Sequence, residues 1–431
     1  MRDGARQQAA IEILTSLETH RRPAADAVRE WMQTHRFAGS KDRAEIGDIV
    51  FGALRWKQSS AYRFGADNPR AAVWGALRWG FGKSADWIEQ SLVDDPHAPA
   101  PPSEQERAAL YEQTPASRLE GAPAWVRGDY PEWLEPSFVR AFGDARAEEG
   151  AALAAPAPLD LRANVLKSSL GEVITALGES PRLKGPPSPT PYAPEGVRIP
   201  WSQGRTFAWA MEQAFVKGWY EVQDEGSQLA ALWSGAQPGM QVADVCAGGG
   251  GKTLALAALM QNKGQIYAFD VDGRRLAPLN ERLERSGARN VQIRAPQRTR
   301  DVLADLHGRM DVVLVDAPCS GSGTWRRNPD SKWRLRPNAL EMRQREQREA
   351  LALAAPLVKP GGALVYVTCS VLPEENEDQI AAFLRSYADF SPAGLVGADQ
   401  VPAHKRGDGV QLSPLTTGCD GFFVASLRRV A

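Results

Sequence analysis

Two cysteines of this chain lie where a thiol is available for chemistry. Cys319 follows the apolar run "VVLV" in "DAPCSGSGTW", and Cys369 follows the apolar run "ALVYV" in "TCSVLPEENE". Proline and glycines force a sharp, exposed turn around Cys319, so this thiol is not expected to pack in a core. A cysteine in such a place can act as a thiolate nucleophile, particularly beside a helix N-terminus that lowers its pKa. The 4 cysteines of the chain are too irregularly spaced for a disulfide framework or a CxxC zinc site.

A glycine-rich loop precedes both cysteines along the chain. It reads "DVCAGGGGKT", and its four consecutive glycines, Gly248 to Gly251, let a ligand approach the backbone closely. The helix that follows offers free N–H groups and the positive end of its dipole. The loop matches neither the P-loop pattern nor the dinucleotide pattern GxGxxG cleanly. It also suits a nucleoside that carries a carboxylate, such as S-adenosylmethionine.

Two acidic residues extend this site. Asp270 ends the next apolar run, "IYAFD", where a carboxylate can accept hydrogen bonds from both ribose hydroxyls. Asp316 ends the run "VVLVD", so we expect its carboxylate near the cofactor. Together with the glycine loop, these residues favour an adenosine cofactor, either a dinucleotide or S-adenosylmethionine.

Two thiols that face such a cofactor suggest one particular reaction. The C5 carbon of a pyrimidine is a poor nucleophile, but attack of a thiolate at C6 activates it to take a methyl group from a sulfonium. The C5 proton must leave before the enzyme is released. A second thiol beside the first can assist that elimination.

The elements that position these residues alternate between strand and helix patterns from about residue 240. The strand-like runs occupy 241–247, 264–271, 290–295, 310–317, 362–370 and 421–429. This alternation predicts an α/β fold whose sheet is doubly wound, mainly parallel and covered on both faces. Ligands of such sheets bind beyond the carboxyl ends of the strands. We therefore expect both cysteines to open onto the crevice that holds the cofactor.

The chain before residue 240 has a different character. Residues 1–65 space their apolar side chains at helical intervals, the stretch 95–135 continues this region, and no strand pattern appears before about residue 150. A linker, "GAALAAPAP", then leads to a strand, "LDLRANVLK", and an amphipathic helix, "SLGEVITALGE". We expect three domains: a helical domain (1–150), a small α+β module (159–225) and a catalytic domain (226–431).

The net charge of −1 hides an asymmetry along the chain. Residues 85–150 carry 5 Arg against 14 Asp and Glu, whereas residues 271–350 carry 17 Lys and Arg against 11 Asp and Glu. Almost all of these cations are arginines, which prefer bidentate phosphate contacts and stack on bases. No window is apolar enough to span a membrane, and the charged N-terminus lacks the apolar core of a signal peptide. We expect a cytoplasmic protein.

Three of these motifs resemble those of one family. "DVCAGGGGKT" is similar to "DLCAAPGGKT", "DAPCSGSGTWRRNPDSKWR" to "DAPCSGxGxxRRxPDxxW", and "TCSVLPEENE" to "TCSxxxxENE" of the RsmB/Sun family of RNA (cytosine-5) methyltransferases. The resemblance extends over nearly the whole chain. It implies a Rossmann-like, class I methyltransferase sheet that uses S-adenosylmethionine. It also implies that the helical domain is NusB-like and binds RNA, and that the small module is RNA-recognition-like.

The resemblance assigns roles to individual residues. Cys369 would be the nucleophile, and Cys319 would promote product release. Asp316 would lie between cofactor and target base, and Asp270 would hold the ribose. The methionine part of the cofactor would be held by Cys246, Ala247, Gly248, Gly249, Gly250, Gly251 and Lys252.

The sequence departs from the family pattern at two places. Gly248 and Gly249 stand where the family has Ala-Pro, so the loop has more entropy to lose on binding, although we expect binding to be retained. After the third strand, a Gly-Asp that meets the adenine amino group is replaced by a region with Ala295, Pro296 and Gln297. The amide oxygen of Gln297 is the candidate for that hydrogen bond.

Methylation of C5 of a cytosine in structured RNA is the leading hypothesis. Ribosomal RNA is the favoured substrate and transfer RNA the alternative, and we expect a monomer without a metal or a membrane partner. Arg326 and Arg327, beside the Pro-Cys loop, are expected to contact the RNA backbone. A second hypothesis is a non-catalytic RNA-binding or assembly factor with a decayed methyltransferase fold, which the intact pair of cysteines disfavours. A small-molecule methyltransferase would not explain the additional domains.

Overall fold

The computed structural model describes residues 1–20, 22–111 and 119–430, which form two compact units. The first unit comprises Met1–Ala155 and Trp325–Leu335, and the second comprises Pro156–Thr324 and Arg336–Ala431. Residues 112–118, within the stretch 95–135 that is expected to be helical, lie outside the described residues. None of the helices in the described ranges is both long and apolar enough to cross a membrane.

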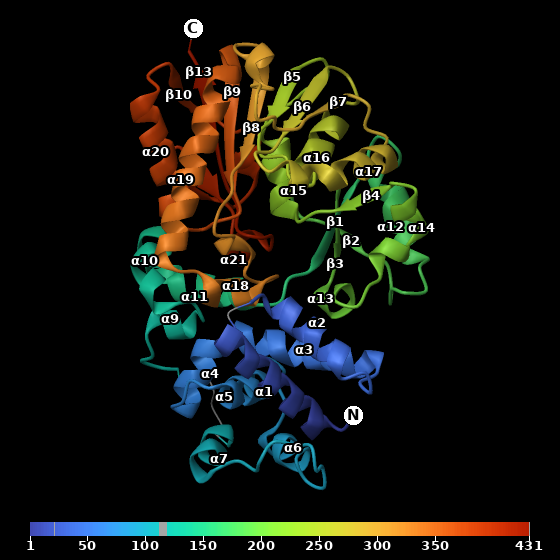
Figure 1. Cartoon of the computed structure of the whole chain (residues 1–431), viewed down its shortest axis with the longest axis vertical. Coiled ribbons are helices and arrows are strands. Elements are labelled where there is room, and N and C mark those ends of the chain that lie inside the picture. Colours follow the sequence, from blue (N-terminus) through green and yellow to red (C-terminus); the bar gives the residue numbers. More distant parts are fainter. Residues whose placement is uncertain (21, 112–118, 431) are drawn as a thin grey trace. The chain divides into compact units, whose positions relative to one another are not determined.

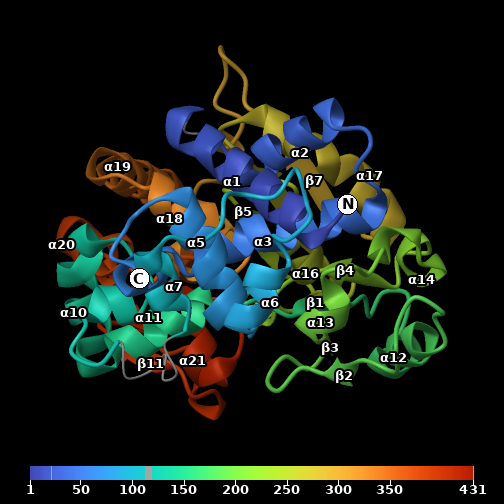
Figure 2. The same ribbon diagram turned by 90° about the horizontal axis from the view of Figure 1, so that it is seen from below.

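The first unit is built from short helices around an apolar core. Helices α1 (Asp3–His20), α3 (Ser40–Arg55) and α5 (Pro69–Gly75) lie side by side in Figures 1 and 2. Ile13 and Trp74 are buried between them, as the helical spacing of apolar residues predicts. Further α-helices in the described residues before 156 are α2 (Ala24–Thr34), α4 (Lys57–Phe64), α6 (Ala85–Gln90), α7 (Glu104–Leu110), α9 (Ala124–Arg127), α10 (Glu135–Phe142) and α11 (Arg146–Ala154).

A segment from far along the chain completes this unit. It contains α18 (Pro329–Arg334) and packs among the N-terminal helices. The buried Lys332 donates hydrogen bonds from Nζ to the carbonyl oxygens of Arg55 (2.8 Å) and Asp129 (2.6 Å). Burial lowers the pKa of Lys332 to about 7. These contacts anchor a segment that begins only six residues after Cys319.

The second unit begins with a small antiparallel sheet. Its strands run in the order β2-β3-β1-β4, and α12 (Leu170–Gly178) and α14 (Gln213–Val216) lie beside it in both ribbon views (Figures 1 and 2). Leu161, Val197 and Tyr220 form part of its buried core. The strands are β1 (Leu159–Ala163), β2 (Ser188–Pro189), β3 (Gly196–Ile199) and β4 (Tyr220–Val222).

A nine-stranded sheet forms the rest of this unit. The order of its main path is β11-β12-β13-β9-β8-β5-β6-β7, and β10 pairs with β13. The five strands from β5 to β9 pair in parallel, and β13 runs antiparallel to β9. This arrangement confirms the predicted α/β class with a mainly parallel, doubly wound sheet. The central strands are β5 (Gln241–Asp244), β6 (Gln265–Phe269), β7 (Val291–Arg294), β8 (Met310–Asp316), β9 (Val358–Thr368) and β13 (Phe423–Arg429).

Alternate residues of these strands face two different helix layers. Val313 and Leu364 lie in the core that includes α19 and α20, whereas Val312 and Val365 lie in the core that includes α15 and α16 (Figure 1). Burial on both faces explains why the strands are continuously apolar in sequence. The helices are α15 (Glu225–Leu232), α16 (Gly251–Leu259), α17 (Ala277–Ser286), α19 (Pro337–Ala354) and α20 (Glu377–Ser386).

Three further strands lie near the edge of this sheet beyond β9. They are β10 (Phe390–Ala393), β11 (His404–Arg406) and β12 (Gly409–Gln411). The sequence analysis does not predict these strands, because three or four residues are too few to show the two-residue alternation of a strand.

Candidate active site

The carboxyl ends of two neighbouring strands bring two thiols together. β8 and β9 pair in parallel, with Asp316 opposite Val367, so the loops that follow them leave the same edge of the sheet. The Sγ atoms of Cys319 and Cys369 lie 3.4 Å apart, within hydrogen-bonding distance for sulfur. The structure therefore places the two cysteines side by side, although 50 residues separate them along the chain.

A buried carboxylate ties the two cysteine loops to each other. Glu375, at the end of a short helix (Pro373–Glu375), accepts hydrogen bonds from the backbone N–H of Ser320 (2.7 Å) and from the hydroxyls of Ser320 and Ser370 (2.5 Å each). The side-chain amide of Gln347 in α19 donates to it as well (3.1 Å). Burial raises the pKa of Glu375, and its hydrogen bonds oppose that rise. Because the two serines directly follow the two cysteines, this carboxylate restrains the distance between the thiols.

The environment of the thiol pair favours a proton on Cys319. The pKa of Cys319 is raised well above its usual value, first by the hydrogen bond with Cys369 and then by burial. Cys319 therefore remains a neutral thiol at physiological pH. Its neutral S–H group can donate a hydrogen bond to the sulfur of Cys369, which lies 3.4 Å away.

The glycine-rich loop lies at the carboxyl end of β5. Gly248 and Gly250 have φ angles of 50° and 85°, in the left-handed region that favours glycine. The N–H of Gly250 donates to the carbonyl oxygen of Ala247 (2.8 Å), and α16 begins at the next residue. The loop thus makes a tight turn directly before a helix N-terminus, where free N–H groups attract an anion.

Asp270 holds this loop from the end of β6. Its carboxylate is buried, and it accepts hydrogen bonds from the N–H groups of Gly248 (3.0 Å) and Asp272 (3.0 Å). Arg275 also pairs with it at 3.1 Å, through a side chain that is 54% exposed. In the structure, Asp270 therefore connects the glycine loop to the strand beside it.

Asp316 and Lys252 face each other across the carboxyl edge of the sheet. Their side chains form an ion pair of 2.8 Å, in which Lys252 is buried and Asp316 is 34% exposed. Nearby, burial raises the pKa of Asp244 to about 7, and Thr253 donates its hydroxyl to that carboxyl group (2.7 Å). Burial likewise raises the pKa of Cys246, so this third thiol is an unreactive neutral group at physiological pH.

The residues around the loop fit S-adenosylmethionine. The two glycines with positive φ bring bare backbone to the site, and the start of α16 presents positive charge suited to a carboxylate. The partly exposed Asp316 offers the opposite charge to an ammonium or sulfonium group. Ala295, Pro296 and Gln297 follow β7 and are all exposed.

The structure corrects one expectation for the arginines. Arg326 is buried, with 4% of its surface exposed, and its carbonyl oxygen accepts a hydrogen bond from Arg55 (2.6 Å) within the helical unit. The prediction that Arg326 contacts an RNA phosphate is therefore wrong, because its side chain is packed in the protein. Arg327 is half-buried.

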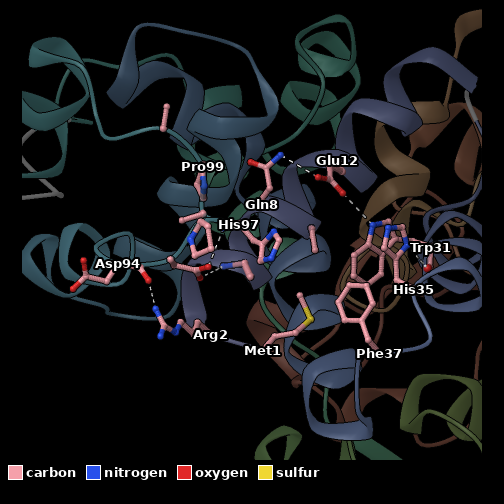
Figure 3. Close-up of a pocket in the computed structure, with 16 residues that line it drawn as sticks. Met1, Arg2, Gln8, Glu12, Trp31, His35, Phe37, Asp94, His97 and Pro99 are labelled. Atoms are coloured by element: carbon pink, nitrogen blue, oxygen red, sulfur yellow. Dashed lines mark hydrogen bonds between the residues drawn. The ribbon is translucent and has the colours of Figure 1, made fainter.

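A separate pocket of about 1000 Å³ lies within the helical unit. Figure 3 shows Trp31, His35 and Phe37 along one side of it and Asp94 and His97 toward the other. The rings of Trp31 and His35 stack with centroids 4.0 Å apart. The pocket contains none of the cysteine or glycine-loop residues, and its walls carry both carboxylates (Glu12, Asp94 and Asp95) and the cationic Arg2.

The fold and the site together define a class of protein. A doubly wound sheet with a glycine-rich loop after its first strand, an acidic residue after the second and two thiols after the fourth and fifth is the arrangement expected of a methyltransferase that uses S-adenosylmethionine. A model of the family described as 16S rRNA methyltransferase RsmB/F matches residues 231–428. The chain belongs to this family, as the sequence resemblance predicted.

Individual relatives extend the similarity beyond the catalytic region. The chain is 36% identical over 311 residues to a probable ribosomal RNA small subunit methyltransferase B from Synechocystis, covering 70% of this chain and 67% of the relative. It is 30% identical to the ribosomal RNA small subunit methyltransferase B of Thermus thermophilus, covering 100% and 99% of the two chains. The crystal structure of a protein designated PH0851 superimposes with a TM-score of 0.71 at 27% identity, covering 100% of this chain and 99% of that chain.

Membership of the family confirms the predicted activity and cofactor. The chain is an RNA (cytosine-5) methyltransferase that uses S-adenosylmethionine. In the ranges that the structure describes, no cluster of three or more His, Cys, Asp or Glu side chains is arranged to hold a metal ion.

Proposed function

We propose that the chain methylates C5 of a cytosine in ribosomal RNA through a covalent bond between Cys369 and C6 of the base. The observation that carries this proposal is the 3.4 Å separation of two thiols at the edge of the sheet where the glycine loop also lies. The names of the Synechocystis and Thermus relatives support a ribosomal substrate. Transfer RNA is the alternative substrate.

The two thiols divide the chemistry between them. The thiolate of Cys369 adds to C6, and the electron pair of the C5–C6 double bond moves to C5. Bound S-adenosylmethionine supplies the methyl group that C5 takes. The C5 proton then passes to a water molecule, its electron pair restores the C5–C6 double bond, and the bond between Sγ and C6 breaks to release Cys369 as a thiolate. We assign to Cys319 the assistance of this elimination, because its sulfur lies 3.4 Å from that of Cys369.

The cofactor is proposed to lie along the glycine loop. The segment from Cys246 to Lys252 holds its methionine part, and Asp270 holds its ribose. Asp316 lies between the cofactor and the target base. The positive φ angles of Gly248 and Gly250 support the place of the methionine part, and the partly exposed carboxylate of Asp316 supports its place beside the cofactor.

The remaining parts of the chain are proposed to bind RNA. The helical unit acts as a NusB-like RNA-binding domain and the small antiparallel sheet as an RNA-recognition-like module. We place the enzyme in the cytoplasm, where ribosomal RNA is available, and expect a monomer, which light scattering after size-exclusion chromatography measures.

The test of the mechanism uses each cysteine variant with RNA and S-adenosylmethionine. Cys319→Ala should attack and methylate but release slowly, so a denaturing gel should show a retarded, ribonuclease-sensitive band that requires the cofactor. The double variant Cys319→Ala/Cys369→Ala is the control and should give no band. A retarded band from Cys369→Ala instead would mean that the two roles are exchanged.

The substrate is tested separately. Purified protein is incubated with methyl-labelled cofactor and either 16S ribosomal RNA or bulk transfer RNA, with Cys369→Ala as the inactive control. We expect label in the ribosomal RNA, at a cytosine that bisulfite sequencing locates. Label in transfer RNA alone would overturn the ribosomal assignment and leave the mechanism intact.

A further inference from the structure

The glycine loop is held from outside by an arginine that the sequence motifs do not include. Arg282 lies in α17 and donates from Nη1 to the carbonyl oxygen of Gly249 at 2.6 Å. Its other terminal nitrogen, Nη2, donates to Oε2 of Glu221 in β4 at 2.9 Å. Only 25% of the Arg282 side chain is exposed, and Glu221 is 4% exposed. One guanidinium therefore joins the cofactor loop to the small antiparallel sheet.

The peptide that Arg282 contacts is fixed at both of its ends. The carbonyl group of Gly249 points to Arg282, and the N–H of the next residue, Gly250, donates to Ala247 (2.8 Å). The N–H of Gly248 is already bonded to Asp270. These bonds fix the orientation of successive peptide groups in a segment whose four glycines leave the backbone otherwise unrestrained.

Glu221, the residue of the small sheet that Arg282 contacts, is itself held in place. Glu221 also pairs with Arg285 of the same helix at 2.8 Å, through its other oxygen. The guanidinium of Arg285 in turn lies over the ring of Phe215, 4.0 Å from its centroid. Glu221 stands in a strand paired with β1, so the carboxylate is a fixed anchor and not a mobile surface group.

We propose that Arg282 is a positioning residue for S-adenosylmethionine, which holds the glycine loop in its binding conformation by bridging it to Glu221. Where two glycines occupy the positions at which the family pattern has Ala-Pro, the chain lacks the rigidity of proline, and a charge-assisted hydrogen bond supplies the restraint instead. The small sheet thereby contributes to cofactor affinity without a contact of its own to the cofactor. The inference rests on the cofactor assignment above.

The experiment measures cofactor binding by calorimetry for wild type, Arg282→Ala, Arg282→Lys and the control Arg289→Ala, which removes an exposed arginine just after α17. Loss of a hydrogen bond to a charged donor should weaken binding of S-adenosylmethionine about tenfold in Arg282→Ala. Lysine can reach one acceptor but not bridge two, so Arg282→Lys should be intermediate. Arg289→Ala should bind like wild type.

Two further readouts separate positioning from general damage. In steady-state assays, KM for the cofactor should rise while kcat at saturating cofactor and KM for RNA stay within about twofold of wild type. Amide hydrogen exchange at residues 246–250 should accelerate in Arg282→Ala without the cofactor. If Arg282→Ala is poorly folded, Arg282→Lys decides the question.

Unchanged cofactor affinity in a folded Arg282 variant overturns the inference. A fall in kcat with an unchanged affinity overturns it as well, since a loop clamp acts on binding. If wild-type protein itself failed to bind S-adenosylmethionine, the cofactor assignment would be wrong. If wild type and the Arg282 variants bound the cofactor equally well, only the role of Arg282 would be wrong.

Discussion

Replacing Glu375 tests whether one buried carboxylate sets the spacing of the two thiols. The carboxylate of Glu375 accepts four hydrogen bonds, two from Ser320 and one each from Ser370 and Gln347. Glu375→Ala removes the acceptor of all four bonds, at a cost of about 1–3 kcal/mol for each buried donor that finds no other acceptor. Gln347 keeps a bond to the carbonyl oxygen of Pro318 (2.9 Å) and Ser370 one to Ser322 (2.9 Å), so the unfolding free energy should fall by about 2 kcal/mol or more. Glu375→Gln keeps one acceptor oxygen for the two N–H donors, and the serine hydroxyls can turn to accept from its amide. The hydrogen bonds with the two hydroxyls then no longer involve a charged group, and this change should lower the unfolding free energy by about 2 kcal/mol in total.

The catalytic effect should exceed the effect on cofactor binding. Without the negative charge, the two serine hydroxyls must reverse their hydrogen bonds, so the two loops shift, and a displacement of the thiols by a fraction of an ångström slows attack on the base. We expect kcat of Glu375→Gln to fall by about tenfold or more, while the affinity for S-adenosylmethionine stays within about twofold of wild type. Urea unfolding, calorimetry and single-turnover methyl transfer measure the three quantities. Glu377→Gln, which alters a carboxylate paired with Arg406 at 3.4 Å, is the matched control.

The pH dependence gives an independent check on the same residue. Because burial raises the pKa of Glu375, its charged form is disfavoured in the folded protein. The cost to stability is present above the folded-state pKa and is relieved as the pH falls through it. Protonation removes an acceptor from the serine hydroxyls, so activity should decline toward acid pH at a higher pH than for an ordinary glutamate, and Glu375→Gln should lack this limb. A kcat for Glu375→Gln within about twofold of wild type would refute the reasoning.

Three further results are expected. Gly248→Ala should cost about 1–2 kcal/mol of strain, since its φ is 50° and the new Cβ would lie 3.2 Å from Arg275, and calorimetry should show weaker cofactor binding. Lys332→Met should lower the unfolding free energy by about 2 kcal/mol or more, because two buried carbonyl groups lose their donor. Since the folded-state pKa of Lys332 is about 7, wild-type stability should also gain from this group as the pH rises from about 7 toward 10.5, and urea titrations of Lys332→Met should lack that gain. Treatment with a disulfide oxidant should link Cys319 to Cys369, which are 3.4 Å apart, abolish methyl transfer reversibly and reduce the free thiols from four to two; four free thiols in an inactive product would contradict this.

The sequence alone determined the parts of the site that depend on local pattern. Apolar runs that end in Asp270, Asp316 and Cys369 predict buried strands, and loops at the carboxyl ends of such strands collect at one edge of a parallel sheet. The glycines of the cofactor loop indicate a backbone with positive φ angles, because few other residues tolerate that conformation. The motifs around the two cysteines are specific enough to indicate the family and its reaction. These features are visible without coordinates because neighbouring residues along the chain create them.

Only the tertiary structure decided which distant groups meet. The adjacency of β8 and β9 places Cys319 3.4 Å from Cys369, and packing against α19 makes Glu375 the acceptor that joins their loops. Packing within the helical unit buries Arg326, which its sequence context presents as a free cation. Arg282 lies 33 residues from the glycine it holds, on a helix with an ordinary charged pattern. The physical reason is that burial and long-range hydrogen bonds depend on how separate elements pack. A local pattern of residue types does not indicate which distant residue a charged side chain contacts.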